Sequence, residues 1–170
     1  MRMLTKPVAM PPDDAHQILA RATFADRYDM KVAGSNLNAA EATMRIFTRV
    51  PRFVELLLAL RNMIVGPLGL KAGLRGETSR LRIGDLPVIS ISDHRVVLGM
   101  DDKHLDFRVS VDVGTHDDGN QLVSVVSAVR VNNAFGRIYL KVVAPFHRRI
   151  VPWMMMQVCR PSETGVDEIC

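Results

Sequence analysis

The chain has 170 residues, of which 48% are hydrophobic and 24% are charged, and its formal net charge at pH 7 is +4. This length is typical of one domain, and the composition is typical of a globular protein, which excludes a disordered chain. The basic residues are spread along the sequence with no run longer than Arg148-Arg149. Because nucleic-acid binding usually shows a concentrated basic stripe, we expect no nucleic-acid partner.

The apolar segments and the cysteines indicate the compartment. Residues 1–12 contain no apolar core of the length that a signal peptide needs. The most apolar run, residues 53–70, is interrupted by charges, glycine and proline and is too short to span a bilayer. Cys159 and Cys170 have the spacing of neither a metal site nor a disulfide framework. We therefore expect a cytoplasmic monomer or homodimer with no transmembrane segment, metal or other cofactor.

The first part of the chain predicts a short helix and a strand. Residues 1–12 are expected to form a loose leader that ends at two prolines. Asp13 or Asp14 can cap a short helix that runs to Ala22. Residues 24–32, FADRYDMKV, are rich in strand-forming residues and predict the first strand.

Two helices and a connector are expected next. Asn38 and Glu41 have the spacing of a capping box, so a helix begins there and stops by Pro51. A second helix is expected over residues 52–65, where apolar side chains recur at helical spacing. Residues 71–86 contain several glycines and arginines and are expected to form a loop with little regular structure.

The rest of the chain predicts a meander of strands and a closing helix. The four strands are expected over residues 88–92, 95–100, 104–113 and 121–131, and the helix over residues 133–158. The apolar stripe of this helix consists of Ile138, Val142, Phe146, Ile150 and Trp153 with Met154. Pro145 and Pro152 kink the helix, or one of them starts a new helix.

These elements predict the fold class. Neither a sheet nor an amphipathic helix can bury its apolar face alone, so the helix must fold back over the sheet. We therefore expect an α+β fold, in which a curved antiparallel sheet grips a long C-terminal helix and a helix pair follows the first strand. The single domain is expected to cover residues 13–158, with flexible ends over residues 1–12 and 159–170.

A ligand cavity is expected between the sheet and the closing helix. The chain has ten methionines, whose flexible side chains suit an adaptable pocket or simply fill the core. His147, Tyr28 and Tyr139 are the polar candidates, and His147 can instead have a packing role. The candidate pocket residues are Tyr28, Phe107, Val109, Val125, Tyr139, Phe146, His147, Ile150 and Trp153. The side chains expected to be buried at this interface are Leu105, Phe107, Val109, Val125, Val129, Phe146, Ile150 and Trp153.

A second group of polar residues comes from strand alternation. His104, Asp106 and Arg108 lie on one face of their strand, opposite its apolar face. If the next strand pairs so that the apolar faces match, Arg130 lies opposite His104 and diagonal to Asp106. This constellation can orient a polar ligand head group, or it can be a salt-bridge ladder on a solvated face.

The sequence leaves three functional hypotheses open. It contains no Gly-rich phosphate loop and no HExxH, CxxC or GxSxG motif, which disfavours nucleophilic and metal catalysis. The first hypothesis is the binding of a small apolar or amphipathic molecule in the cavity. The second is a cyclase, dehydratase or isomerase that uses acid–base residues there. The third is a module that docks a protein or an anionic membrane through the basic closing helix or through the connector at residues 71–86.

Three segments carry a resemblance to a known family: VVLGMDDKHLDFRVSV at 96–111, FGRIYLKVVAPFHRRIV at 135–151 and PRFVELLLALRNMIVGPLGL at 51–70. They resemble a bacterial family of unknown function, found free-standing or at the C-terminus of short-chain-dehydrogenase-like proteins. The resemblance covers about residues 24–158 and implies the START-like helix-grip superfamily, which encloses hydrophobic ligands. Such domains usually have seven strands and five are expected here, so residues 71–86 must hold further strands or the fold is trimmed. The resemblance implies no reaction.

Overall fold

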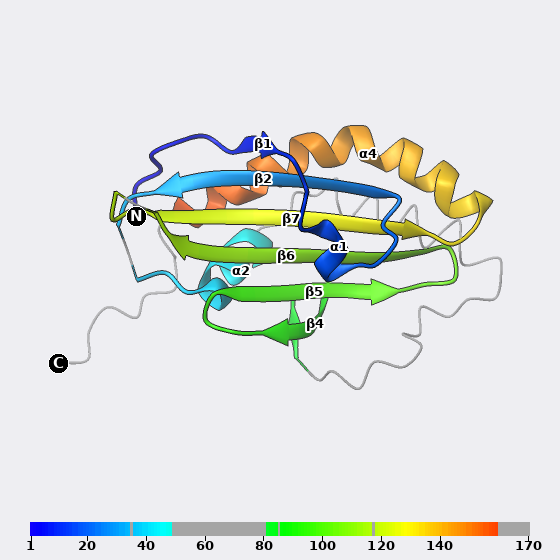
Figure 1. The fold of residues 1–170 in the computed structure, drawn as a ribbon, viewed down its shortest axis with the longest axis horizontal. Helices are drawn as coiled ribbons and strands as arrows, with labels where there is room; N and C mark the ends of the chain where they lie inside the picture. Colours follow the sequence, from blue (N-terminus) through cyan, green and yellow to red (C-terminus); the bar gives the residue numbers. More distant parts are fainter. Residues whose placement is uncertain (35, 49–80, 85, 117, 160–170) are drawn as a thin grey trace.

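The computed structural model describes residues 1–34, 36–48, 81–84, 86–116 and 118–159 (Figure 1). The strands are β1 (Val8–Met10), β2 (Phe24–Val32), β3 (Arg82–Ile83), β4 (Leu86–Ile91), β5 (Arg95–Asp101), β6 (Leu105–Thr115) and β7 (Gln121–Val131). The helices are α1 (Ala15–Ile18), α2 (Ala39–Thr48), α4 (Ala134–Met155) and the 3-10 turn η2 (Met156–Cys159). The strands form one antiparallel sheet in the order β1-β2-β7-β6-β5-β4-β3.

This architecture confirms the predicted α+β fold, in which a curved antiparallel sheet packs against a long C-terminal helix. The predicted cap is also present, because the Asn38 side chain accepts a hydrogen bond of 2.8 Å from the Glu41 backbone N–H. Two short strands were missed. β1 lies in the expected leader and β3 in the expected connector, and strands of three and two residues are too short to show period-two alternation. The helix expected over 52–65 lies outside the described residues.

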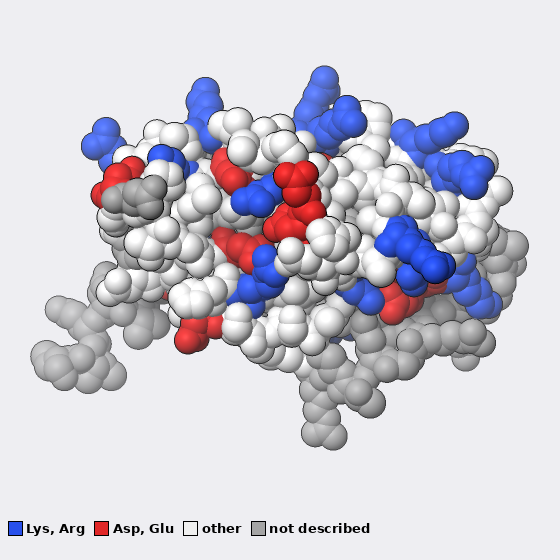
Figure 2. All heavy atoms as spheres, in the orientation of Figure 1, with Lys and Arg blue, Asp and Glu red and all other residues white. Residues whose placement is uncertain are grey.

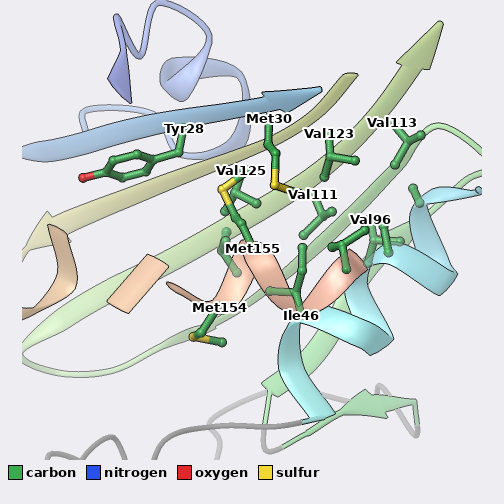
Figure 3. Packing of buried hydrophobic residues seen from close by; sticks show 14 of the residues in the cluster. Tyr28, Met30, Ile46, Val96, Val111, Val113, Val123, Val125, Met154 and Met155 are labelled. Carbon is green, nitrogen blue, oxygen red and sulfur yellow. The ribbon is translucent and has the colours of Figure 1, made fainter. Parts of the chain in front are cut away.

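The main core lies on the face of the sheet that α2 and α4 cover, which we call the inner face (Figures 1 and 3). Side chains at alternate strand positions meet there, as where Val111 of β6 pairs with Val125 of β7. The fully buried members of this core include Met30, Ile46, Val96, Leu98, Val111, Val123 and Met155. The valine-rich meander thus forms one wall, and α2 with the last turns of α4 forms the other.

The opposite face of the sheet, which we call the outer face, carries α1 and a smaller apolar cluster. Ala15 and Leu19 pack there against Val126 and Ala128 of β7. α1 has only four residues and ends before the predicted Ala22, and the Asp14 side chain makes no cap hydrogen bond. The cover that Val126 and Ala128 require is therefore supplied by this short helix.

Helix α4 runs through both of its prolines without a break, so the alternative in which a proline starts a new helix is wrong. It bows outward along its length in Figure 1. At its start, the Asn133 side chain accepts a hydrogen bond of 3.0 Å from the Gly136 N–H. A Cβ atom at Gly136 would lie 2.1 Å from the His104 carbonyl oxygen, so only glycine lets the first turn approach the β5–β6 connection this closely.

The rotation of α4 differs from the prediction. Four side chains of the predicted buried stripe are exposed: Ile138 (63%), Val142 (48%), Phe146 (47%) and Trp153 (37%). Ile150 and Met154 of the same stripe are buried as predicted. The other inward positions include Gly136 and His147. His147 and Met154 follow Gly136 by 11 and 18 residues, close to three and five turns at about 3.6 residues per turn. The close approach of Gly136 and the hydrogen bond of His147 to the sheet thus set the rotation that hydrophobicity alone did not predict.

Candidate functional site

Strand β2 places one carboxylate on the apolar inner face. Its alternate residues Phe24, Asp26 and Tyr28 point to the same face, and this face continues into the core at Met30. The Asp26 side chain is 14% exposed. Its Oδ1 atom is buried and has no hydrogen-bond partner among the described residues. A carboxylate in such surroundings is unfavourable unless it is paired, so the partners of Asp26 are the next question.

His147 of α4 is the partner of Asp26. Its Nδ1 atom lies 2.9 Å from Oδ2 of Asp26, and its ring meets the edge of Phe24 with the centroids 6.1 Å apart. Because a carboxylate only accepts hydrogen bonds, Nδ1 carries the proton in this contact. In the neutral ring Nε2 is then the nitrogen that can accept a proton. The pair therefore has the orientation of a general base held by a carboxylate.

Tyr28 is the proton donor next to this pair. It lies two residues after Asp26 on the same face of β2, which is the inner face that α4 covers. Burial and the negative charge of Asp26 raise the pKa of Tyr28, and the positive charge of Arg148 opposes this in part. The phenol therefore stays protonated at neutral pH and can donate a hydrogen bond.

Ser127 of β7 adds a second buried polar group beside the pair. It is the direct cross-strand partner of Asp26, is fully buried, and its Oγ atom has no hydrogen-bond partner among the described residues. Buried polar atoms in proteins nearly always have partners, so two such atoms at facing positions are notable. Ser127 makes no hydrogen bond to His147 and is completely enclosed, so the three residues do not form a nucleophilic triad as they stand.

The other predicted pocket residues divide by burial. Tyr28, Val109, Val125 and Ile150 are buried, and Phe107, Tyr139 and His147 are half-buried. Val129 is also buried and Leu105 is half-buried. The prediction that Phe146 and Trp153 are buried is wrong, because both side chains lie on the exposed side of α4. The polar centre of the site therefore consists of residues from β2, β7 and the middle of α4.

The predicted constellation of His104, Asp106, Arg108 and Arg130 does not converge. Arg130 lies opposite Asp106, not opposite His104, and donates to it at 2.6 and 2.9 Å. Arg108 pairs with Asp101 at 2.8 Å. The His104 ring contacts Asn133 at 2.8 Å, so it belongs to the helix cap. The faces were predicted correctly, but the register was displaced by two residues, a shift that leaves every side chain on its face.

Asp26 and Ser127 were missed by the sequence reasoning, although a signal existed. In FADRYDMKV the period-two alternation puts Asp26 between Phe24 and Tyr28 on the face that leads to Met30 and Val32. A charged residue within such an apolar series is informative because carboxylates are seldom buried without a function or a partner. The partner, His147, is 121 residues away, and no local pattern indicates that contact.

Two negative findings apply to the described residues only. No group of three or more His, Cys, Asp or Glu side chains in this part of the chain is arranged to hold a metal ion. No helix in it has both the length and the apolar character that crossing a bilayer requires.

Comparisons with known proteins identify the family. No curated protein matches the chain. Among solved structures, the chain is similar to CalU16 from Micromonospora echinospora, with 9% identity, 91% of this chain and 93% of that chain covered, and a TM-score of 0.29. It is also similar to the conserved protein of unknown function EF2215 from Enterococcus faecalis, with 10% identity, coverage of 90% and 86%, and a TM-score of 0.29. The family DUF2867, described as a protein of unknown function, matches residues 18–154, and the chain therefore belongs to this family.

Proposed function

We propose that the protein binds a small amphipathic molecule between the inner face of the sheet and α4, with the polar group of the ligand at Asp26, Tyr28 and His147. The observation that carries this proposal is the half-satisfied carboxylate of Asp26. Oδ2 is bonded to His147, whereas Oδ1 is buried without a partner among the described residues. A ligand hydroxyl or amine that donates to Oδ1 compensates for its desolvation.

The polar atoms define the head group that fits best. Oδ1 of Asp26 and Nε2 of His147 are acceptors, and the Tyr28 hydroxyl is a donor. Arg148 adds positive charge near Tyr28. These groups suit a neutral head group that has both a hydroxyl and a carbonyl oxygen. A free carboxylate is disfavoured because Asp26 repels it.

The apolar part of the ligand has a matching environment. Met30, Met154 and Met155 lie on the adjoining part of the inner face (Figure 3). Methionine side chains are unbranched and polarizable, so they repack around a guest at low cost. This arrangement also supports our placement of the family with the START-like helix-grip proteins. In that superfamily the ligand lies between the sheet and the closing helix.

Thermal-shift measurements on purified protein with a panel of lipids and polyketides test this proposal, together with native mass spectrometry of the protein as it comes from cells. We expect a ligand-dependent rise in melting temperature that is lost in Asp26→Asn. The matched control is Asp29→Asn, which changes a carboxylate of the same strand that points to the outer face and pairs with Arg27. If no panel member shifts the melting temperature and no small molecule co-purifies, the proposal is wrong.

The orientation of the pair also favours a second candidate function, acid–base catalysis of an isomerase or dehydratase type. Nε2 of His147 can remove a proton from a carbon next to a ketone while Tyr28 donates a hydrogen bond to the carbonyl oxygen. Asp26 holds the imidazole in the required tautomer. The test is deuterium incorporation from heavy water into a panel of hydrophobic ketones, followed by NMR. Incorporation must disappear in His147→Gln, and a wild-type protein without any incorporation excludes this candidate.

A further inference from the structure

The side of α4 that faces away from the sheet is both apolar and basic. Ile138, Val142 and Trp153 are exposed there, as is Phe146. Its cations are Arg137, Lys141, Arg148 and Arg149, all exposed, and the helix contains no Asp or Glu. Apolar side chains on a monomeric surface are ordinary when they are scattered, but a contiguous series along one helix indicates an interaction surface.

The N-terminal segment is also apolar and basic, and it lies at the same edge of the sheet as α4. β1 is the edge strand next to β2, and α4 packs against β2 and β7, so both elements lie at the β2 end (Figure 1). Residues 1–12 contain Arg2 and Lys6 but no acidic residue, and Leu4, Val8 and Met10 are exposed. We call residues 1–12 and the outward side of α4 the basic edge.

The charge of the whole chain is concentrated on this edge. The basic edge holds six of the 22 Lys and Arg residues and none of the 18 Asp and Glu residues, which leaves 16 cations against 18 acids elsewhere. The rest of the chain therefore has a net charge of −2, and the edge has +6. Figure 2 shows basic side chains along the side where Figure 1 draws α4, whereas acidic and basic side chains alternate in the middle of the face in view.

We propose that the basic edge docks onto an anionic lipid membrane surface. Exposed apolar side chains interleaved with Lys and Arg, without any acid, are the features of a helix that lies in the plane of a membrane interface. The apolar side chains enter the boundary between head groups and acyl chains, and the cations remain at the anionic head groups. Trp153, the one tryptophan of the chain, lies on this edge, and tryptophan favours that boundary. This proposal does not rest on Asp26 and His147, which meet on the other side of α4, although Arg148 of the basic edge also lies near Tyr28.

Co-sedimentation with vesicles tests the proposal on the full chain. We expect binding to vesicles of phosphatidylcholine with phosphatidylserine, little binding to phosphatidylcholine alone, and loss of binding at high salt. Arg137→Glu combined with Lys141→Glu should weaken binding more than about tenfold, because each basic residue near such a surface contributes substantially. The control with the same change in net charge is Arg21→Glu combined with Arg82→Glu, at two exposed arginines outside the basic edge, and it should bind almost as wild type.

The fluorescence of Trp153 distinguishes an anionic membrane from two other occupants of the basic edge, another part of the chain and a second copy of the protein. Anionic vesicles should shift its emission to the blue and protect it from iodide, and Ile138→Gln with Val142→Gln should reduce both effects. Equal loss of binding in the two charge-reversal variants would show a general charge effect and overturn the proposal. So would a Trp153 that iodide does not quench in the free monomer, because another part of the chain then covers the edge. A dimer that excludes iodide from Trp153 would identify a second copy as the occupant and would also overturn it.

Discussion

Charged residues have different surroundings on the two faces of the sheet. On the inner face, Asp26 stands among apolar side chains and has one partner, His147, which reaches it from α4. On the outer face, Arg27 of the same strand donates to both carboxylate oxygens of Asp29, at 2.9 and 3.1 Å. Neighbouring residues of one strand thus belong to two different polar environments.

The outer-face pair is part of a larger network that extends across the sheet. Arg27 also contacts Ser124 at 3.4 Å and Asp14 at 3.6 Å, and Arg95 pairs with Asp112. Because this network lies in partial contact with water, each pair contributes little to stability. The inner pair is out of contact with most of the solvent, and stability does not explain its presence. An apolar replacement of similar volume is often as stable as a buried ion pair. This difference is the reason why we propose a functional role for the inner pair.

Truncation of a side chain in the inner-face core should have the largest effect on stability. Leu98→Ala removes a fully buried side chain on the inner face and should lower the free energy of unfolding by about 2–5 kcal/mol. Ile89→Ala, on the neighbouring strand β4 and 45% exposed, should change it by less than about 0.5 kcal/mol. Urea unfolding measures both. Similar small losses in the two variants would show that the inner face is not a packed core.

The inner pair should behave as a buried pair whose separation is unfavourable. Asp26→Ala leaves His147 without its partner and should cost about 1–3 kcal/mol. The double variant Asp26→Leu with His147→Leu should be close to wild type in stability, because both polar groups are then removed together. The double variant should also lose ligand binding. A double variant that is less stable than Asp26→Ala would instead assign the pair a structural role.

Removal of the outer pair, Arg27 with Asp29, should lower the stability only slightly, and the loss should depend on ionic strength. Arg27→Gln should lower the free energy of unfolding by less than about 1 kcal/mol, and added salt should reduce the difference from wild type. The comparison is a pair of urea titrations at low and high salt. A loss as large as that of Asp26→Ala would remove the contrast between the faces.

Tyr28 should give the smallest effect, visible only at alkaline pH. Its pKa is raised in the folded state by burial and by Asp26, so the unfolded chain releases this proton first. The resulting stability is present below about pH 10, the ordinary pKa of tyrosine, and is lost as the pH rises through the folded pKa. Wild-type stability should therefore fall more steeply above about pH 10 than that of Tyr28→Phe. Parallel curves would show that Tyr28 is not in the buried environment described.

Local signals were sufficient for the longer strands, for α2 and α4, and for the fold class. The bounds of β2, the cap at Asn38 and the extent of α4 follow from periodicity, turn residues and capping, which act within a few residues. Strand alternation also assigned the faces of β6 correctly, so Val109 is buried as expected. Tyr28 and His147 were recognised as polar candidates because both lie on or beside apolar stripes.

The contacts between these elements were decided by the tertiary structure alone. The rotation of α4 depends on Gly136 against the backbone at His104 and on His147 against Asp26, contacts between residues 32 and 121 positions apart in the chain. A hydrophobic stripe shows that a helix has an apolar side, but it does not show which of two apolar sides meets the sheet. The sequence by itself thus determined the longer elements and which of their faces are apolar. Only the folded chain determined that most of the apolar stripe of α4 remains exposed while Ile150 and Met154 are buried. It also brought Asp26, Ser127 and His147 together, because long-range packing has no local signature.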